Sequence, residues 1–255
     1  MLLLALMMTA ADDANWAPPP TDAERQVADR LQATNDPAFL KASARGALAA
    51  LGDDNGSAGL LAELAETGSS QTAQQAAESL MFRPRVEAPL AAGYPPPTRV
   101  HAIEVKRLPA YRMAKADMKT DENTPFWALF GHIQRNQIAM TVPVQMDYDA
   151  DGERMQSMAF LYRRPDMGQL GTDEAMPLAV EVVDVPSRLV LSTGLRSRDE
   201  AAIEAAESRL RSWLADHPEY EPSGPLMVLG YNAPMTPKRE RIVEVQIPVT
   251  KADDR

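Results

Sequence analysis

The stretch IEVKRLPAYRMAKA, residues 103–116, decides the fold, because VEVVDVPSRLVLST, residues 180–193, repeats its pattern further along the chain. Each begins with an apolar residue followed by Glu-Val, and Pro109 and Pro186 occupy matching positions. Both stretches alternate apolar and polar residues and are interrupted by a proline, which predicts two β-strands joined at that proline. A repeated order of elements indicates duplicated halves.

The repeat extends beyond the strand pairs. A helix is predicted after each pair, over residues 125–135 and 197–217, and each helix leads to a strand broken by a proline, at Pro143 and Pro234. We therefore predict an α+β fold, in which a pseudo-twofold repeat of antiparallel strands plus one helix each forms a distorted β-barrel with two helices. Because breaks in strands gather at barrel rims and beside sites, we expect the binding site between the two broken strands.

A small all-α module is predicted ahead of this domain, over residues 21–82, which are rich in Ala, Leu, Glu and Gln. Thr21 and Glu24 fit a capping box, and Asp36 before Pro37 fits a helix start. Four helices are expected, over residues 22–33, 37–51, 58–66 and 71–82. The proline-rich residues 83–98 are predicted to be an extended linker, which places the second domain at 99–250.

Composition limits the functions that the chain can have. The net charge is −10 and the pI is near 4.9, which disfavours binding to nucleic acid or to an anionic membrane surface. Cysteine is absent, which excludes disulfides, thiolate metal sites and covalent attachment of haem through thioethers. After the N-terminus, no apolar run approaches the roughly 20 residues of a membrane span.

Residues 1–20 are predicted to be a signal peptide and a short tail, cleaved after Ala11. This predicts export, to the periplasm or out of the cell. The alternative is a cytoplasmic protein, because the apolar run from Leu2 to Met8 is short and no Lys or Arg precedes it.

Five short motifs follow one another in the second domain: FWALFGHI (126–133), MTVPV (140–144), LSTG (191–194), GYNAPMTP (230–237) and RIVEV (241–245). In this order they resemble the SOUL haem-binding family over roughly residues 100–250. The resemblance implies a distorted barrel with two helices that binds haem or a related tetrapyrrole non-covalently, in a shallow apolar cleft beside the first helix. The chain departs from the family at Asn232 and Ala233, and it has no histidine near Tyr111, where some members present one.

The candidate cofactor-binding residues are Phe126, Phe130, Met140, Tyr231, Met235, His132 and Arg135. Phe126 and Phe130 share one side of the predicted helix at i, i+4 spacing, so a place in the core is the alternative for both. His132 is the candidate iron ligand, as the only histidine within a motif; the alternative is a hydrogen-bonded helix histidine. Arg135, Lys238 and Arg239 are candidate partners for haem propionates.

The chain is predicted not to be an enzyme, because it carries none of the common catalytic motifs. An alternative is that the same scaffold binds or hydrolyses another small amphiphilic molecule, with Glu104 or Glu181 as the active carboxylate. That alternative requires both glutamates to point into one cleft. A third alternative is an exported interaction protein that binds through its helical module. The oligomeric state is left open.

Overall fold

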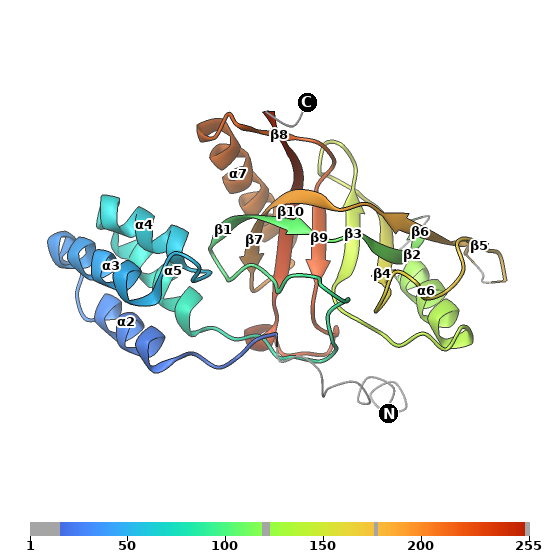
Figure 1. The fold of residues 1–255 in the computed structure, drawn as a ribbon, viewed down its shortest axis with the longest axis horizontal. Coiled ribbons are helices and arrows are strands. Elements are labelled where there is room, and N and C mark those ends of the chain that lie inside the picture. Colours follow the sequence, from blue (N-terminus) through green and yellow to red (C-terminus); the bar gives the residue numbers. More distant parts are fainter. Residues whose placement is uncertain (1–15, 119–122, 176–177, 253–255) are drawn as a thin grey trace.

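The computed structural model describes residues 16–118, 123–175 and 178–252. A group of four helices lies beside a single large sheet, and two further helices pack on that sheet (Figure 1). The predicted cleavage site after Ala11 lies outside the described residues. No helix in the described ranges has the length and apolar character needed to span a membrane.

The helical region consists of α2 (Asp22–Gln32), α3 (Pro37–Leu51), α4 (Ala58–Thr67) and α5 (Ser70–Met81). The predicted capping box is confirmed, since Thr21 Oγ1 accepts from Glu24 N at 3.1 Å and Glu24 Oε2 accepts from Thr21 N at 2.8 Å. Asp36 caps α3 by accepting from the first free N–H groups, with Pro37 at the first turn, as predicted. These local hydrogen bonds satisfy groups that a helix start otherwise leaves open.

The strands are β1 (Ile103–Leu108), β2 (Tyr111–Asp117), β3 (Val144–Tyr148), β4 (Met155–Leu161), β5 (Gly171–Asp173), β6 (Val180–Val185), β7 (Arg188–Leu195), β8 (Tyr220–Pro222), β9 (Met227–Gly230) and β10 (Val243–Lys251). Their order in the sheet is β1-β7-β10-β9-β3-β4-β2-β6-β5, with β8 paired to β10. All named pairs are antiparallel. The remaining elements are α6 (Asn123–Arg135), α7 (Glu200–Asp216) and a 3₁₀ turn, η1 (Lys238–Glu240).

The predicted barrel is wrong, because the sheet does not close. The end strands, β1 and β5, each pair with a single neighbour among the described residues, β7 and β6 respectively. With only three residues, β5 ends the ladder instead of continuing it to β1. The two halves meet at the central pair β3–β9, while β1 and β6 each pair with a strand of the other half. The pseudo-twofold repeat stays a prediction.

The sheet buries both of its faces. Helices α6 and α7 share one core with the side chains of one face, including Val243, Val245 and Ile247 of β10. The opposite face is covered by Trp16 and by residues 88–100, which form a second core with the other side chains of the sheet. Alternate residues of β10 point to opposite faces of the sheet, because side chains along a strand have a period of two residues.

The segment expected as a linker therefore lies against the sheet. Leu90 forms a parallel bridge with Val142, and Trp16 Nε1 donates to Ala88 O at 3.1 Å. Tyr94, in the same segment, is 4% exposed. Residues from Ala88 onward in this segment thus pack on a face of the sheet, and the division of the chain at a linker stays a prediction.

The strand breaks at the two prolines meet at one end of the sheet. β3 starts directly after Pro143, which follows a cis Val142–Pro143 peptide bond, and Pro234 comes shortly after β9 ends. Val144 pairs with Gly230, so the start of β3 lies beside the end of β9. The two broken strands therefore lie side by side at the place where the binding site was expected.

Candidate functional site

An apolar cavity of about 90 Å³ lies where β3 starts and β9 ends. We call it the α6 cleft and define it by Phe126, Met140, Val144, Met146 and Met158 together with the loop 230–234. Val144 and Met146 project from one face of β3, and Met146 pairs with Met158 of β4. Most of these residues are apolar, and they include three methionines, whose unbranched side chains adapt to irregular partners.

The aromatic wall of the cleft comes from the first turn of α6. The ring of Phe126 is partly exposed, and it meets Phe160 of β4 edge-on with a centroid distance of 5.4 Å. The ring of Phe130 stacks behind it at 6.2 Å and is 8% exposed. One face of the helix thus contributes to both the cleft and the core.

The opposite wall is the loop 230–234, which is held by residues of the segment 83–98. Glu87 Oε2 accepts from Ala233 N at 2.7 Å, and Glu87 Oε1 accepts from Thr236 Oγ1 at 2.6 Å. Asn232 Nδ2 donates to Arg85 O at 2.6 Å, while its Oδ1 accepts from Ile242 N at 2.8 Å. These bonds fix the loop without a regular ladder.

A buried carboxylate supports the loop from behind. Glu244 is fully buried; it accepts from Tyr231 Oη at 2.6 Å and from Ser192 Oγ at 2.5 Å, and it forms an ion pair with Lys106. Burial alone would raise the pKa of Glu244, but the ion pair and hydrogen bonds hold this pKa below its usual value. The same burial raises the pKa of Tyr231 well above its usual value, so its phenol remains a hydrogen-bond donor.

Cations gather on the far side of the loop 230–234, around a second hollow of about 110 Å³. Arg198 lines both this hollow and the α6 cleft. Arg241 Nη2 donates to Pro234 O at 2.5 Å, and Lys238 lies 3.7 Å from Asp199 at the surface. An anionic group on a ligand in the cleft would therefore find positive charge at this edge.

The structure brings together three of the predicted binding residues, Phe126, Met140 and Tyr231, in the α6 cleft. Phe130 lies behind Phe126 in the core, which is the alternative that the sequence left open. Met235 directly follows the cleft loop and is 88% exposed.

His132 and Arg135 lie in a different cavity, of about 610 Å³, at the other end of α6. His132 Nδ1 is 2.6 Å from Asp173 Oδ2, and its Nε2 is 2.8 Å from Tyr162 Oη. Arg135 forms an ion pair with the same aspartate. Because both ring nitrogens have protein partners, iron ligation by His132 would require one of these contacts to break.

This network also affects the acidity of its members. Burial raises the pKa of Tyr162 to about 12, and the hydrogen bond from His132 lowers the pKa of Asp173. His132 is 4% exposed, and its network ties α6 to β5 and to Tyr162, the residue that directly follows β4. The arrangement is that of the hydrogen-bonded helix histidine that was the alternative to a ligand.

The two candidate carboxylates are far apart in the sheet. Glu104 is on β1, at one end of the strand order, and Glu181 is on β6, next to the other end, with an exposed side chain. They do not form an acid–base pair, and neither lines the α6 cleft. In the described ranges, no group of three or more His, Asp or Glu side chains is placed to hold a metal ion.

Sequence reasoning missed several residues of the cleft. The alternation of Val144 and Met146 in a predicted strand could have indicated that they share a face. Glu87 and Arg198 had no such signal, because each reaches the cleft through contacts between segments that are distant in sequence.

The family model that matches residues 94–248 is described as SOUL heme-binding protein. The chain belongs to this family. The match confirms the resemblance drawn from the five motifs, and it begins inside the segment that was predicted as a linker. The description of the SOUL family suggests haem, or a related planar small molecule, as the class of ligand. No curated protein sequence matches the chain.

Solved structures with a related shape are remote from this SOUL chain. The C-terminal domain of EcmrR is 13% identical, with a TM-score of 0.45, over 59% of this chain and 98% of that one. A protein described as a hydrolase from Listeria innocua is 10% identical, with a TM-score of 0.45, over 59% of this chain and 93% of that one. SAV2435 bound to tetraphenylphosphonium is 9% identical, with a TM-score of 0.35, over 60% of this chain and 96% of that one. Likenesses at this level say nothing about the ligand of this chain.

Proposed function

We propose that this chain binds haem or a related tetrapyrrole non-covalently at the α6 cleft. The observation that carries the proposal is an apolar cleft, walled by Phe126 and three methionines, that opens beside an edge of cations including Arg198. A tetrapyrrole has a broad apolar face and acidic side arms, which are the two features that this arrangement accommodates. Membership of the SOUL family supports the same class of ligand.

The size of the cleft sets a condition on this proposal. Its volume of about 90 Å³ is below the roughly 300–1,000 Å³ of typical ligand pockets. A tetrapyrrole must therefore lie across the mouth of the cleft, with Met140 and the loop 230–234 moving apart to admit an edge of the ring. Methionine side chains repack easily, and the loop is joined to the segment 83–98 by side-chain hydrogen bonds instead of a ladder.

Affinity is then expected to come from the burial of apolar surface, at about 25 cal/mol for each Å² removed from water. The described cleft residues include methionine and tyrosine, which ligate haem iron in some proteins, but no histidine. We therefore expect binding that does not depend on His132.

The test is titration of haemin into the purified full chain, followed by the shift of the Soret band. We expect saturation with one haemin per chain. Ala233→Trp, which fills the cleft, should weaken binding at least tenfold, whereas Ala92→Trp, at an exposed position in the segment 83–98, should not. His132→Ala should bind nearly as tightly as the wild type.

Arg198→Gln tests the cationic edge, with Arg30→Gln on the exposed side of α2 as a control of equal charge change. We expect the first substitution to weaken haemin binding severalfold and the second to have no effect. An unchanged haemin spectrum at micromolar wild-type protein, or equal binding by wild type and Ala233→Trp, would contradict the proposal.

A further inference from the structure

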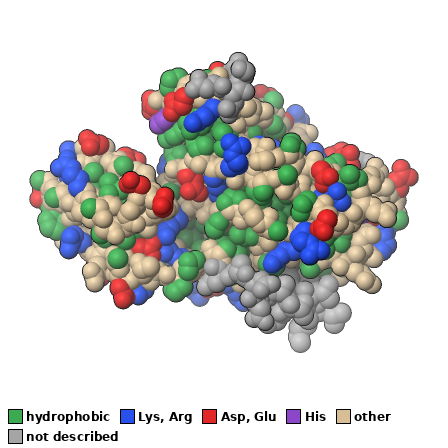
Figure 2. All heavy atoms as spheres, viewed as in Figure 1, with side chains coloured by type: hydrophobic (Ala, Val, Ile, Leu, Met, Phe, Trp, Pro, Cys, Tyr) green, Lys and Arg blue, Asp and Glu red, His purple; other side chains and the backbone are tan. Residues whose placement is uncertain are grey.

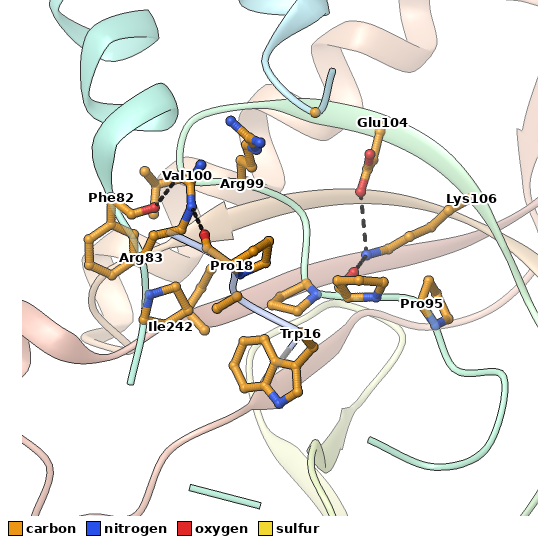
Figure 3. Close-up of a pocket in the computed structure, with 15 residues that line it drawn as sticks. Trp16, Pro18, Phe82, Arg83, Pro95, Arg99, Val100, Glu104, Lys106 and Ile242 are labelled. Carbon is orange, nitrogen blue, oxygen red and sulfur yellow. Dashed lines mark hydrogen bonds and ion pairs between the residues drawn. The ribbon is translucent and has the colours of Figure 1, made fainter. Parts of the chain in front are cut away.

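A larger cavity lies where the helical region meets the sheet, and the surface is hollowed there (Figures 2 and 3). Its volume of about 360 Å³ falls in the range of small-molecule pockets. It shares no lining residue with the α6 cleft. Much of its wall comes from residues before 94, including Trp16 and Phe82, and so lies outside the part of the chain that matches the SOUL family.

The walls of this cavity are flat and apolar. Trp16, Phe82 and the run Pro95–Pro97 line it. The indole of Trp16 is fixed in place, because its Nε1 donates to Ala88 O and its ring packs at 5.6 Å from the ring of Tyr231. Rigid rings of this kind favour an aromatic guest, which buries its faces without ordering new side chains.

Two arginines and one glutamate form the charged wall towards the helical region. Glu24 accepts from Arg83 Nη2 at 3.0 Å and from Arg99 Nη1 at 2.7 Å, so a single carboxylate faces two guanidinium groups. Each side-chain nitrogen of Arg83 already has a partner, because Nε donates to Pro18 O and Nη1 donates to Leu80 O and Phe82 O. This wall carries one positive charge in excess.

Arg99 is the residue with donors to spare. Its Nη1 contacts Glu24 and Ser57, and its Nε and Nη2 have no protein partner within the ranges that the structure describes. The side chain is 27% exposed and lines the cavity. A guanidinium with two open donors binds a carboxylate more strongly than a neutral acceptor.

The opposite side of the cavity has the other sign. Figure 3 shows Lys106 beside Glu104, at 3.5 Å, and its ammonium also donates to Pro96 O at 3.0 Å. Glu244, behind the wall of the cavity, forms a further ion pair with Lys106, so two carboxylates face one ammonium. An anionic guest is repelled from this side and attracted to the side of Arg99. The charges therefore give the guest one orientation.

We propose that this cavity is a second binding site, for a small aromatic carboxylate, with the carboxylate at Arg99 and the ring between Trp16 and the prolines 95–97. The site is separate from the α6 cleft, and the proposal does not depend on the ligand proposed there.

The probe is 2-naphthoate, titrated into the full chain by isothermal calorimetry. We expect saturable binding of one molecule per chain, at least tenfold weaker for Arg99→Gln. Arg107→Gln, an exposed position on the same strand as Lys106, removes the same charge and should bind as the wild type does. 2-Naphthamide, which keeps the ring and lacks the charge, should bind at least tenfold more weakly than 2-naphthoate.

The location of the naphthoate site needs a separate test, because Arg99→Gln also removes an ion pair of Glu24. Ala17→Trp narrows this cavity and should abolish naphthoate binding while haemin binding is kept. Ala233→Trp should weaken haemin binding at least tenfold and leave naphthoate binding unchanged. The melting temperature of each variant shows that it is folded. The proposal would be overturned if 2-naphthoate did not bind saturably, if 2-naphthamide bound equally well, or if naphthoate binding survived Ala17→Trp. Each of these outcomes counts whatever the result with haemin.

Discussion

Replacing Glu24 by Gln should destabilise the junction between the helical region and the sheet. The carboxylate of Glu24 joins four segments of the chain: it accepts from Thr21 N at the start of α2, from Asn55 Nδ2 at 3.2 Å, and from Arg83 and Arg99. Its side chain is 5% exposed. Glutamine keeps the shape but removes the charge that both guanidinium groups face.

The magnitude follows from the acidity of this group. Burial alone would raise the pKa of Glu24, but the bonds from Thr21, Arg99 and Asn55 outweigh burial and lower this pKa from 4.5 to about 2. At ~1.36 kcal/mol per pKa unit, the carboxylate contributes about 3 kcal/mol to folding at pH 7. Because the folded-state pKa is lowered, this contribution is present above pH 4.5 and is lost as the pH falls towards 2. At pH 3 it is about 1.4 kcal/mol.

The assay is urea unfolding of wild type and Glu24→Gln at pH 7, 5 and 3, with Glu66→Gln at an exposed position of α4 as the matched control. The free energy of unfolding should be lower for Glu24→Gln by about 3 kcal/mol at pH 7, and the gap to the wild type should narrow at pH 3. The control should differ by less than about 0.5 kcal/mol throughout. A gap below about 1 kcal/mol at pH 7, or one that stays constant with pH, would refute the reasoning.

Three further expectations can be measured on the same material. Asp36→Ala removes the cap of α3 and should lower the free energy of unfolding by about 1 kcal/mol, read from urea unfolding. Phe160→Ala removes a side chain that is 2% exposed and should lower the free energy of unfolding by about 3–5 kcal/mol in the same measurement. A decrease below about 1 kcal/mol would contradict this, because it would mean that the neighbouring side chains collapse into the cavity. Tyr162→Phe should remove one phenol that ionises near pH 12 from the ultraviolet titration of the folded protein, and loss of a phenol titrating near 10 would contradict the buried network.

The outcome for His132 shows why the candidate site was only partly predictable. Sequence placed His132 on the same helix as Phe126, and the helix is confirmed. Which cavity each side chain reaches depends on how the helix lies against Tyr162, just after β4, and Asp173 of β5, which both contact the histidine. Those contacts join residues 30 and 41 positions away from His132 in the chain, so no local pattern indicates them.

The sequence by itself determined the helices and their starts, the two-residue alternation of the strands and the family. Each of these depends on bonds or periodicities within a few residues, such as the capping box of Thr21 and Glu24. Only the tertiary structure decided that the sheet stays open, that residues 88–100 cover one of its faces, and that Glu87 and Arg198 reach the cleft. The physical reason is that burial and hydrogen bonds between distant parts of the chain select the strand register and the position of a docked segment. Several registers and positions compete until the whole core is packed.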